Sequence, residues 1–431
     1  MCATSVSASA AEEGASGVGV GVGTGVGAGD GEGAVCPRAA VAPARAGAAA
    51  ASTSLFAKRR REGERVGSDI CRLCQSFMCS IYLDSARRAP EPDRFRAMIL
   101  AALLLQVAAP SPSAPSVLRW VPKHEELTYT FGGAKPLQRI RPGTRIVTWT
   151  EDCFDGAVKT RADLPSKVMA PGHDNPQTGP FYVEGAEPGD TLAIRILKLE
   201  PARSWAVSAF SPGFGALVGT DRTAILGPDF PETTWRYEVD AKKNLARTTS
   251  GDGKLAWEVP LTPFLGCLGV APAGGEARTT IVPGNFGGNM DCPEVRAGNT
   301  VSLGVNVPGG LVSFGDGHFA MGDGEIMGAA IEGAMNVELI VDLVKGRPTP
   351  VPKIENADEV MFVGSGRPLE DAARVAFKAM VGWVREATGL SELDAYQFVS
   401  QNAKAPIIQL VDPEYTVLVK IEKKRLPARR P

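Results

Sequence analysis

Alternation of apolar and polar residues, restarted after short glycine turns, constrains the fold of this chain more than any other feature. The alternation runs through residues 145–149, 191–196 and 300–305, each preceded by a turn with Gly at its second position, and again through 337–343. Side chains of a strand point to opposite faces in turn, so the pattern predicts antiparallel sheets with one face on the core. Short strands at such intervals favour a β-sandwich or a β-barrel.

The apolar spacing changes towards the C-terminus from two residues to three and four, which predicts an amphipathic helix. The residues at this spacing are Leu369, Ala373, Ala376, Met380, Trp383 and Ala387. Gly389 is placed to end this helix and Ser391 to cap a second one, and residues 415–421 are expected to form a final strand. The predicted fold class is β-rich (α+β), an antiparallel β-sandwich or barrel core with a small C-terminal helical α/β part.

The beginning of the chain differs from the rest in amino-acid composition. Gly, Ala, Val and Ser repeats fill it, and no aromatic residue precedes Phe56, so this segment cannot build a core. We therefore expect a disordered extension over residues 1–97. The folded part is expected to comprise a β-rich catalytic core at 118–350 and a C-terminal α/β part at 351–431 that completes the domain.

Residues 98–117 separate the extension from the core. Basic Arg94 and Arg96 precede an apolar run, 99–109, that ends in small residues, which is the pattern of a secretory signal peptide followed by a linker. This pattern favours a true start at Met98 and a periplasmic or secreted protein, provided that residues 98–109 act as a signal. The alternative is a plain apolar linker, and then the protein is expected in the cytoplasm.

Charge and hydrophobicity exclude several classes of partner. The 46 basic and 48 acidic side chains nearly balance, so neither nucleic acid nor an acidic membrane surface is expected as a partner. No apolar run reaches the roughly 18 residues that span a bilayer, so we expect no stable membrane insertion.

Four segments are denser in carboxylates, amides and glycine than plain turns require: 150–156, 175–190, 283–294 and 314–325. The last is the most informative, because Asp316 and His318, and then Asp323 and Glu325, are each two residues apart. In extended chain such pairs point to one face. One imidazole with carboxylates suits Zn²⁺ or a similar divalent ion, which lowers the pKa of bound water to about 7 and polarises a carbonyl.

Simpler readings of these residues stay open at this point. An Asp beside Gly is often a turn former, and a lone His is often structural. Cys292 as a nucleophile with His318 as its base is a further option, but nothing in the sequence indicates an activated thiol.

These segments, in this order, resemble the acetamidase/formamidase family over about residues 120–425. The phrases that carry the resemblance are 175–190, 287–291, 307–309, 315–325, 394–396 and 411–413. The resemblance implies a β-rich fold, a homo-oligomer (dimer or trimer), a divalent metal, and hydrolysis of formamide, acetamide or similar amides. The chain departs from the family at 128–133, where many members carry a His-Gly-Trp-like segment, and at Cys292, where members often carry an aliphatic residue.

Together these observations lead to a hypothesis of metal-assisted amide hydrolysis by activated water. Asp152, Asp291 and His318 would hold the ion, with zinc preferred over calcium. Glu184 or Glu325 would pass the proton to the leaving ammonia, which must leave as NH₃ because NH₂⁻ is too basic.

Three further residues complete the hypothesis. Asn289 or backbone N–H groups would stabilise the oxyanion. Asp316 and Asp323 would orient the ligands.

Two other functions remain to be weighed against hydrolysis of small linear amides. One is hydrolysis of a larger or cyclic amide by the same fold. The other is a secreted β-sandwich binding module that uses the Asp/His cluster only for a structural metal. A binding module would tolerate Glu184→Gln and Glu325→Gln, whereas an amidase would lose activity in at least one of them.

Overall fold

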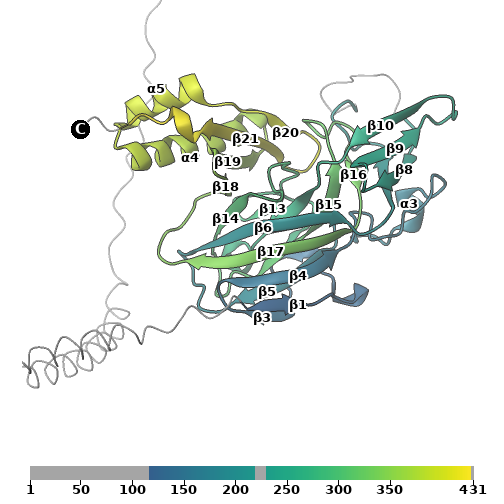
Figure 1. Cartoon of the computed structure of the whole chain (residues 1–431), viewed down its shortest axis with the longest axis horizontal. Coiled ribbons are helices and arrows are strands. Elements are labelled where there is room, and N and C mark those ends of the chain that lie inside the picture. Colours follow the sequence, from purple (N-terminus) through teal and green to yellow (C-terminus); the bar gives the residue numbers. More distant parts are fainter. Residues whose placement is uncertain (1–115, 219–229, 429–431) are drawn as a thin grey trace, which may run out of the picture. The chain divides into compact units, whose positions relative to one another are not determined.

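The computed structural model describes residues 116–218 and 230–428 (Figure 1). The expected extension at 1–97 and the signal-like segment up to residue 115 lie outside the described residues. Within the described ranges, no helix is long and apolar enough to cross a bilayer.

A nine-stranded sheet contains every strand that alternation predicted. Its order is β1 (Val117–Arg119), β4 (Thr144–Thr150), β17 (Met335–Val344), β6 (Thr191–Pro201), β14 (Thr300–Gly304), β18 (Lys353–Glu355), β19 (Glu359–Gly366), β21 (Tyr415–Glu422) and β20 (Ile407–Gln409). All neighbours are antiparallel except β1 and β4. The predicted antiparallel sheet is confirmed.

A ten-stranded sheet carries the candidate site. Its main path is β10 (Ala256–Pro260), β9 (Leu245–Thr249), β8 (Thr233–Asp240), β7 (Trp205–Phe210), β16 (Ile331–Glu332), β15 (Val312–Ala320), β11 (Phe264–Gly269) and β13 (Gly287–Asn289). Off this path, β5 (Gln177–Val183) pairs with β15 and with β3 (Gln138–Ile140). The remaining pieces are the β2/β12 pair (Thr130–Phe131, Arg278–Thr279), helix α3 (Pro165–Val168) and 3₁₀ turns at His124–Glu126, Ala273–Gly275 and Lys423–Arg425.

The main core lies where buried residues of the two sheets meet. On β6, Leu192, Ile194 and Ile196 are fully buried, and they belong to the same apolar cluster as Leu265 and Phe314 of the ten-stranded sheet. Each sheet has distinct first and last strands in the described chain, so neither closes into a barrel. The β-rich class is confirmed, with open sheets in place of the barrel alternative.

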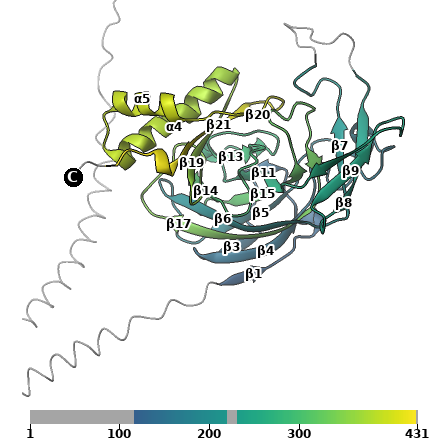
Figure 2. The same ribbon diagram turned by 45° about the horizontal axis from the view of Figure 1, so that its top comes forward.

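Two helices cover the C-terminal end of the nine-stranded sheet (Figure 2). They are α4 (Leu369–Thr388) and α5 (Glu392–Asn402). Side chains of β19 point alternately to the two faces of the sheet, and both faces are buried. Val360 and Phe362 pack with the helices, whereas Met361 and Val363 join the main core. The C-terminal part is therefore continuous with the core through the sheet.

The predicted ends of the helices are confirmed. Gly389 takes a left-handed φ of 78° at the end of α4, a conformation that glycine adopts without strain. The Ser391 hydroxyl accepts a hydrogen bond from the Asp394 backbone N–H at 3.1 Å and caps α5.

Ser391→Ala is expected to lower the free energy of unfolding by about 1 kcal/mol, because the Asp394 N–H loses its partner. Chemical denaturation would measure the change. Ser391→Asp, which restores an acceptor at the cap, should recover most of the loss. Equal losses in both variants would show that the cap contributes nothing.

Candidate active site

Strands β16, β15 and β11, which are neighbours in the ten-stranded sheet, bring the polar residues together. Phe264 and Cys267 of β11 pair with His318 and Gly315 of β15. Gly266 of β11 therefore lies opposite Asp316 of β15. Strand β15 is buried along its whole length. Its polar residues therefore point into protein and not into bulk water.

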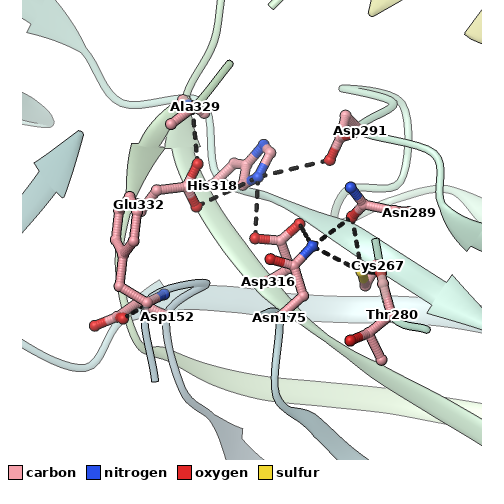
Figure 3. Close-up of polar contacts among 12 residues, drawn as sticks. Asp152, Asn175, Cys267, Thr280, Asn289, Asp291, Asp316, His318, Ala329 and Glu332 are labelled. Carbon is pink, nitrogen blue, oxygen red and sulfur yellow. Dashed lines mark hydrogen bonds and ion pairs between the residues drawn. The ribbon is translucent and has the colours of Figure 1, made fainter. Parts of the chain in front are cut away.

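Three carboxylates converge on one nitrogen of His318 (Figure 3). Nε2 lies 3.3 Å from Asp316 Oδ1, 3.3 Å from Glu332 Oε2 and 3.7 Å from Asp291 Oδ1. All four side chains are about 1% exposed. A ring nitrogen carries one proton at most and can satisfy one acceptor, so this arrangement leaves carboxylate oxygens without a donor.

Four buried atoms of this cluster have no hydrogen-bond partner in the described chain: Asp291 Oδ2, Asp316 Oδ1, Glu332 Oε2 and His318 Nδ1. Buried polar atoms are costly when unpaired. No Lys or Arg among the described residues forms an ion pair with these carboxylates. The unpaired oxygens and the missing positive charge fit a bound cation.

The ligand atoms fall into two adjacent sets. Asp291, His318 and Glu325 form one, and their ligand atoms all lie within 4.8 Å of one another. Cys153, Asp316 and Glu332 form the other under the same limit. Oxygen and imidazole ligands of the first set are those that Zn²⁺ accepts.

Gly266 keeps the centre of the cluster open. A Cβ on this residue would lie 2.7 Å from Asp291 Oδ1 and 2.8 Å from His318 Nε2, and closer still to Asp316 Oδ2. Any residue other than glycine at position 266 would therefore fill the space between these atoms. The cluster surrounds room for an ion.

The backbone is strained where it presents these side chains. Asn175, Asp291, Asp316 and Glu325 all have φ between 46° and 57°, a region that residues other than glycine seldom adopt. Such conformations persist only where surrounding structure holds them, and they gather at functional sites.

A hydrogen-bonded chain of side chains borders the cluster. Asn289 Nδ2 donates to Asp412 Oδ2 at 2.8 Å, and Asn289 Oδ1 accepts from Asn175 Nδ2 at 3.0 Å and from the Cys267 thiol at 2.8 Å. Asn175 Nδ2 also lies 3.3 Å from Asp316 Oδ2. Asn289 thus connects residues from three distant parts of the chain.

Burial sets the ionisation of the carboxyls. It raises the pKa of Asp291, Glu325 and Glu332 well above their usual range, and it raises the pKa of Asp412 to about 7. Neighbouring carboxylates add to the effect. Without a cation these groups retain protons that an ion would displace.

Burial and the neighbouring carboxylates act in opposite directions on the pKa of His318. Burial acts to lower the pKa of its imidazole, but Asp316 and the other carboxylates outweigh burial and raise it above its usual value. The ring is therefore held in a strongly negative environment.

Asp152 lies beside the cluster with its oxygens engaged. Its Oδ1 accepts the backbone N–H groups of Phe154 and Gly156, both at 3.0 Å, and its Oδ2 pairs with Arg203 at 2.9 Å. Arg203 also pairs with Glu151. Asp152, expected as a ligand, thus holds the loop that presents Cys153. The group of side chains around His318 that could hold an ion contains Glu325 and not Asp152.

Two other expected residues lie away from the cluster. Glu184 is about half exposed and pairs with Arg141 at 3.7 Å, at the end of β5. Asp323 is exposed, on a different groove from the cavity over the cluster. Neither residue is brought to His318.

Three residues of the site were missed by reasoning from the sequence: Asn175, Glu332 and Asp412. Asn175 and Asp412 belong to phrases of the family resemblance, but no role was predicted for either residue. Glu332 is a single charge in an apolar run, 329–335, which is a signal of a buried carboxylate.

A cavity of about 270 Å³ opens over the cluster. Its floor is polar, whereas part of its wall is apolar. The apolar side chains include Phe154, Met169, Ala209, Phe214 and Ile281. A substrate in this cavity would meet both the charged groups of the cluster and apolar surface.

Comparison with known proteins places these features in a family. The model of the Acetamidase/Formamidase family matches residues 133–275 and 270–419, more than half of the chain. An acetamidase of Mycolicibacterium smegmatis is 28% identical over 260 residues, covering 48% of this chain and 63% of its own length. The chain spans less than two thirds of the length of the curated relatives that it matches.

Solved structures extend the likeness to the fold. An acetamidase from Yersinia enterocolitica has a TM-score of 0.68 and 34% identity, covering 74% of this chain and 96% of that one. An acetamidase from Bacillus halodurans has a TM-score of 0.64 and 30% identity, covering 72% of this chain and 100% of that one.

Proposed function

Because the chain belongs to the acetamidase/formamidase family, we propose that it hydrolyses small linear carboxylic amides to carboxylate and ammonia with the help of a divalent cation. The observation that carries this proposal is the convergence of buried, unpaired carboxylates on His318 beneath a cavity of substrate size.

Asp291, His318 and Glu325 would hold the cation. The imidazole favours zinc, since calcium prefers six to eight oxygen ligands. The chemistry that a bound divalent cation supplies is polarisation of the amide carbonyl and a lowered pKa of water, about 7.

Asp412 is the residue best placed to carry the proton. It lines the cavity, it is 3% exposed, and burial raises its pKa to about 7 in the metal-free chain, which brings this carboxyl towards the range in which it can both accept and return a proton. The carboxylate would take a proton from the attacking water and give it to the amide nitrogen as the C–N bond breaks. This role replaces the one expected for Glu184 or Glu325.

Asn289 would act as a positioning residue. Its Nδ2 group is already bonded to Asp412, and its Oδ1 holds Asn175. The geometry therefore favours orientation of the proton carrier over the expected oxyanion contact.

The cavity leaves room beyond a formyl or acetyl group. Its apolar wall supports a second candidate, hydrolysis of an amide with a larger apolar acyl group. Each additional buried methylene contributes about 0.8 kcal/mol, so a series of amides of rising chain length would locate the preferred size.

Ammonia release from formamide, acetamide and longer amides tests the proposal. We expect turnover that falls at least about 10²-fold after chelation and returns with Zn²⁺, because the cation contributes several kcal/mol to the transition state. Turnover unchanged after complete metal removal would reject the cation while keeping the amidase. No turnover on any amide by folded, metal-loaded protein would favour the binding module.

We also propose an oligomeric state and a location for the protein. A dimer or trimer would be detected by light scattering of the purified chain. Periplasmic or secreted location would be detected by fractionation of cells, together with the N-terminal residue of the mature protein.

A further inference from the structure

Three ligating side chains beside the proposed ion site have no part in the reaction so far: Cys153, Asp316 and Glu332. Their ligand atoms lie within 4.8 Å of one another, and all three residues line the cavity. Cys153 is a half-buried free thiol, whereas Asp316 and Glu332 are about 1% exposed.

Two buried oxygens in this set lack a hydrogen-bond partner. Glu332 Oε1 accepts the Ala330 backbone N–H at 2.7 Å, but Oε2 has no hydrogen-bond donor. Asp316 Oδ2 accepts from Asn175, but Oδ1 has no such donor. Both oxygens lie 3.3 Å from His318 Nε2, and that nitrogen cannot donate to them when it binds the first ion. The two carboxylates then lie near one thiol without a donor, which is costly unless a positive charge lies between them.

The number of ligands exceeds what one ion takes. A catalytic zinc uses three protein ligands and an open position. Here the two sets supply six residues, among them Glu325 in the first set. Pairs of metal ions about 3.5–4 Å apart are a known arrangement for hydrolytic sites.

Charge leads to the same conclusion. Four carboxylates belong to the two sets, and an ionised Cys153 thiol would add a fifth negative charge. One divalent ion would balance only two of these charges. The nearby guanidinium of Arg203 is paired with Glu151 and Asp152. A second divalent ion would balance two more.

We propose that Cys153, Asp316 and Glu332 hold a second divalent cation, next to the ion of Asp291, His318 and Glu325. A thiolate among the ligands favours zinc or a similar borderline-soft ion over magnesium or calcium. The thiol would release its proton to solvent as the ion binds. The inference goes beyond the proposed function, which requires only one ion.

Backbone hydrogen bonds fix the loop that carries Cys153. The Cys153 carbonyl accepts the Asn175 backbone N–H at 3.0 Å, and Asp152 Oδ1 accepts the N–H groups that follow Cys153. Residues from 152–156 and 175 are thereby fixed relative to β15.

Cobalt(II) binding to the full chain tests the second site. The metal-stripped wild type is titrated with Co²⁺, and bound cobalt and the near-ultraviolet thiolate-to-cobalt charge-transfer band are measured. Cys153→Ser is expected to bind one ion fewer per chain and to lose the part of the band that Cys153 contributes. Cys292→Ala, which alters a buried core thiol outside both sets, should match the wild type.

A second variant keeps the result interpretable. Cys153→Asp supplies a carboxylate instead of the thiol, so it should restore the ion count without the band. The cysteines before residue 80 are common to every protein compared, so they cancel in the difference.

The outcomes separate this inference from the proposed function. Equal cobalt content and equal spectra in wild type and Cys153→Ser would overturn the second site, while zinc-dependent ammonia release would still support the first. Absence of bound cobalt in the wild type, together with ammonia release that is unchanged in the metal-stripped protein, would reject the cation mechanism as a whole.

Discussion

Gly266→Ala is expected to yield a folded protein that binds less divalent cation and has a kcat/KM for small amides lower by about 10²-fold or more. The new methyl group would stand 2.7 Å from Asp291 Oδ1 and 2.8 Å from His318 Nε2. It would therefore occupy the space between the ligand atoms. Crowding of a buried position also costs about 1–3 kcal/mol of stability.

Gly322→Ala is the matched control, because a Cβ there meets nothing within 4 Å. Its cation content and kcat/KM should equal those of the wild type. Cation content is measured after dialysis and kcat/KM by ammonia release. A Gly266→Ala protein with full cation content and full activity would show that the cluster does not surround the reaction centre.

Asp412→Asn is expected to lower kcat/KM by about 10²–10⁴-fold, the usual contribution of a positioned acid or base. The amide has the same shape, but it cannot accept and return a proton. In the wild type, activity should rise as the pH passes the pKa of Asp412, because the reaction needs this carboxyl ionised; a bound cation lowers that pKa from its value of about 7 in the metal-free chain. The variant should lose this dependence, as measured in a pH–rate profile.

The pH dependence of the melting temperature tests the pKa of Asp412 independently of turnover. Its folded pKa of about 7 exceeds the usual 3.8. Its protonation therefore stabilises the metal-free fold fully below pH 4, and the contribution is lost as pH rises through about 7. The melting temperature of metal-free wild type should fall more between pH 5 and 8 than that of Asp412→Asn. Identical falls would contradict the assigned pKa.

Much of the fold followed from local pattern. The strands at Thr144–Thr150, Thr191–Pro201, Thr300–Gly304 and Met335–Val344 were predicted from alternation, and Gly389 and Ser391 from helix-end chemistry. These features depend on residues a few positions apart. The pairing of strands was not predictable in the same way, because it depends on contacts between distant segments.

The site was predictable only in part. His318, Asp316, Asp291, Glu325 and Asn289 do lie together. They were expected because Gly-rich loops concentrated ligating residues. The roles of Asp152, Glu184 and Asp323 could not be predicted, because they depend on neighbours in space. Arg203 pairs with Asp152, Arg141 pairs with Glu184, and Asp323 is exposed to solvent.

The sequence by itself determined that this chain forms antiparallel strands, ends in two helices and concentrates polar residues in glycine-rich segments. A spacing of two, or of three and four, dictates which face each side chain takes. Only the tertiary structure decided which carboxylates meet. Sheet pairing places β11 beside β15 and β16 beside β15, and the turn before β21 adds Asp412. Convergence of groups separated by up to 259 residues (Cys153 to Asp412) is a property of that packing, and no local pattern encodes it.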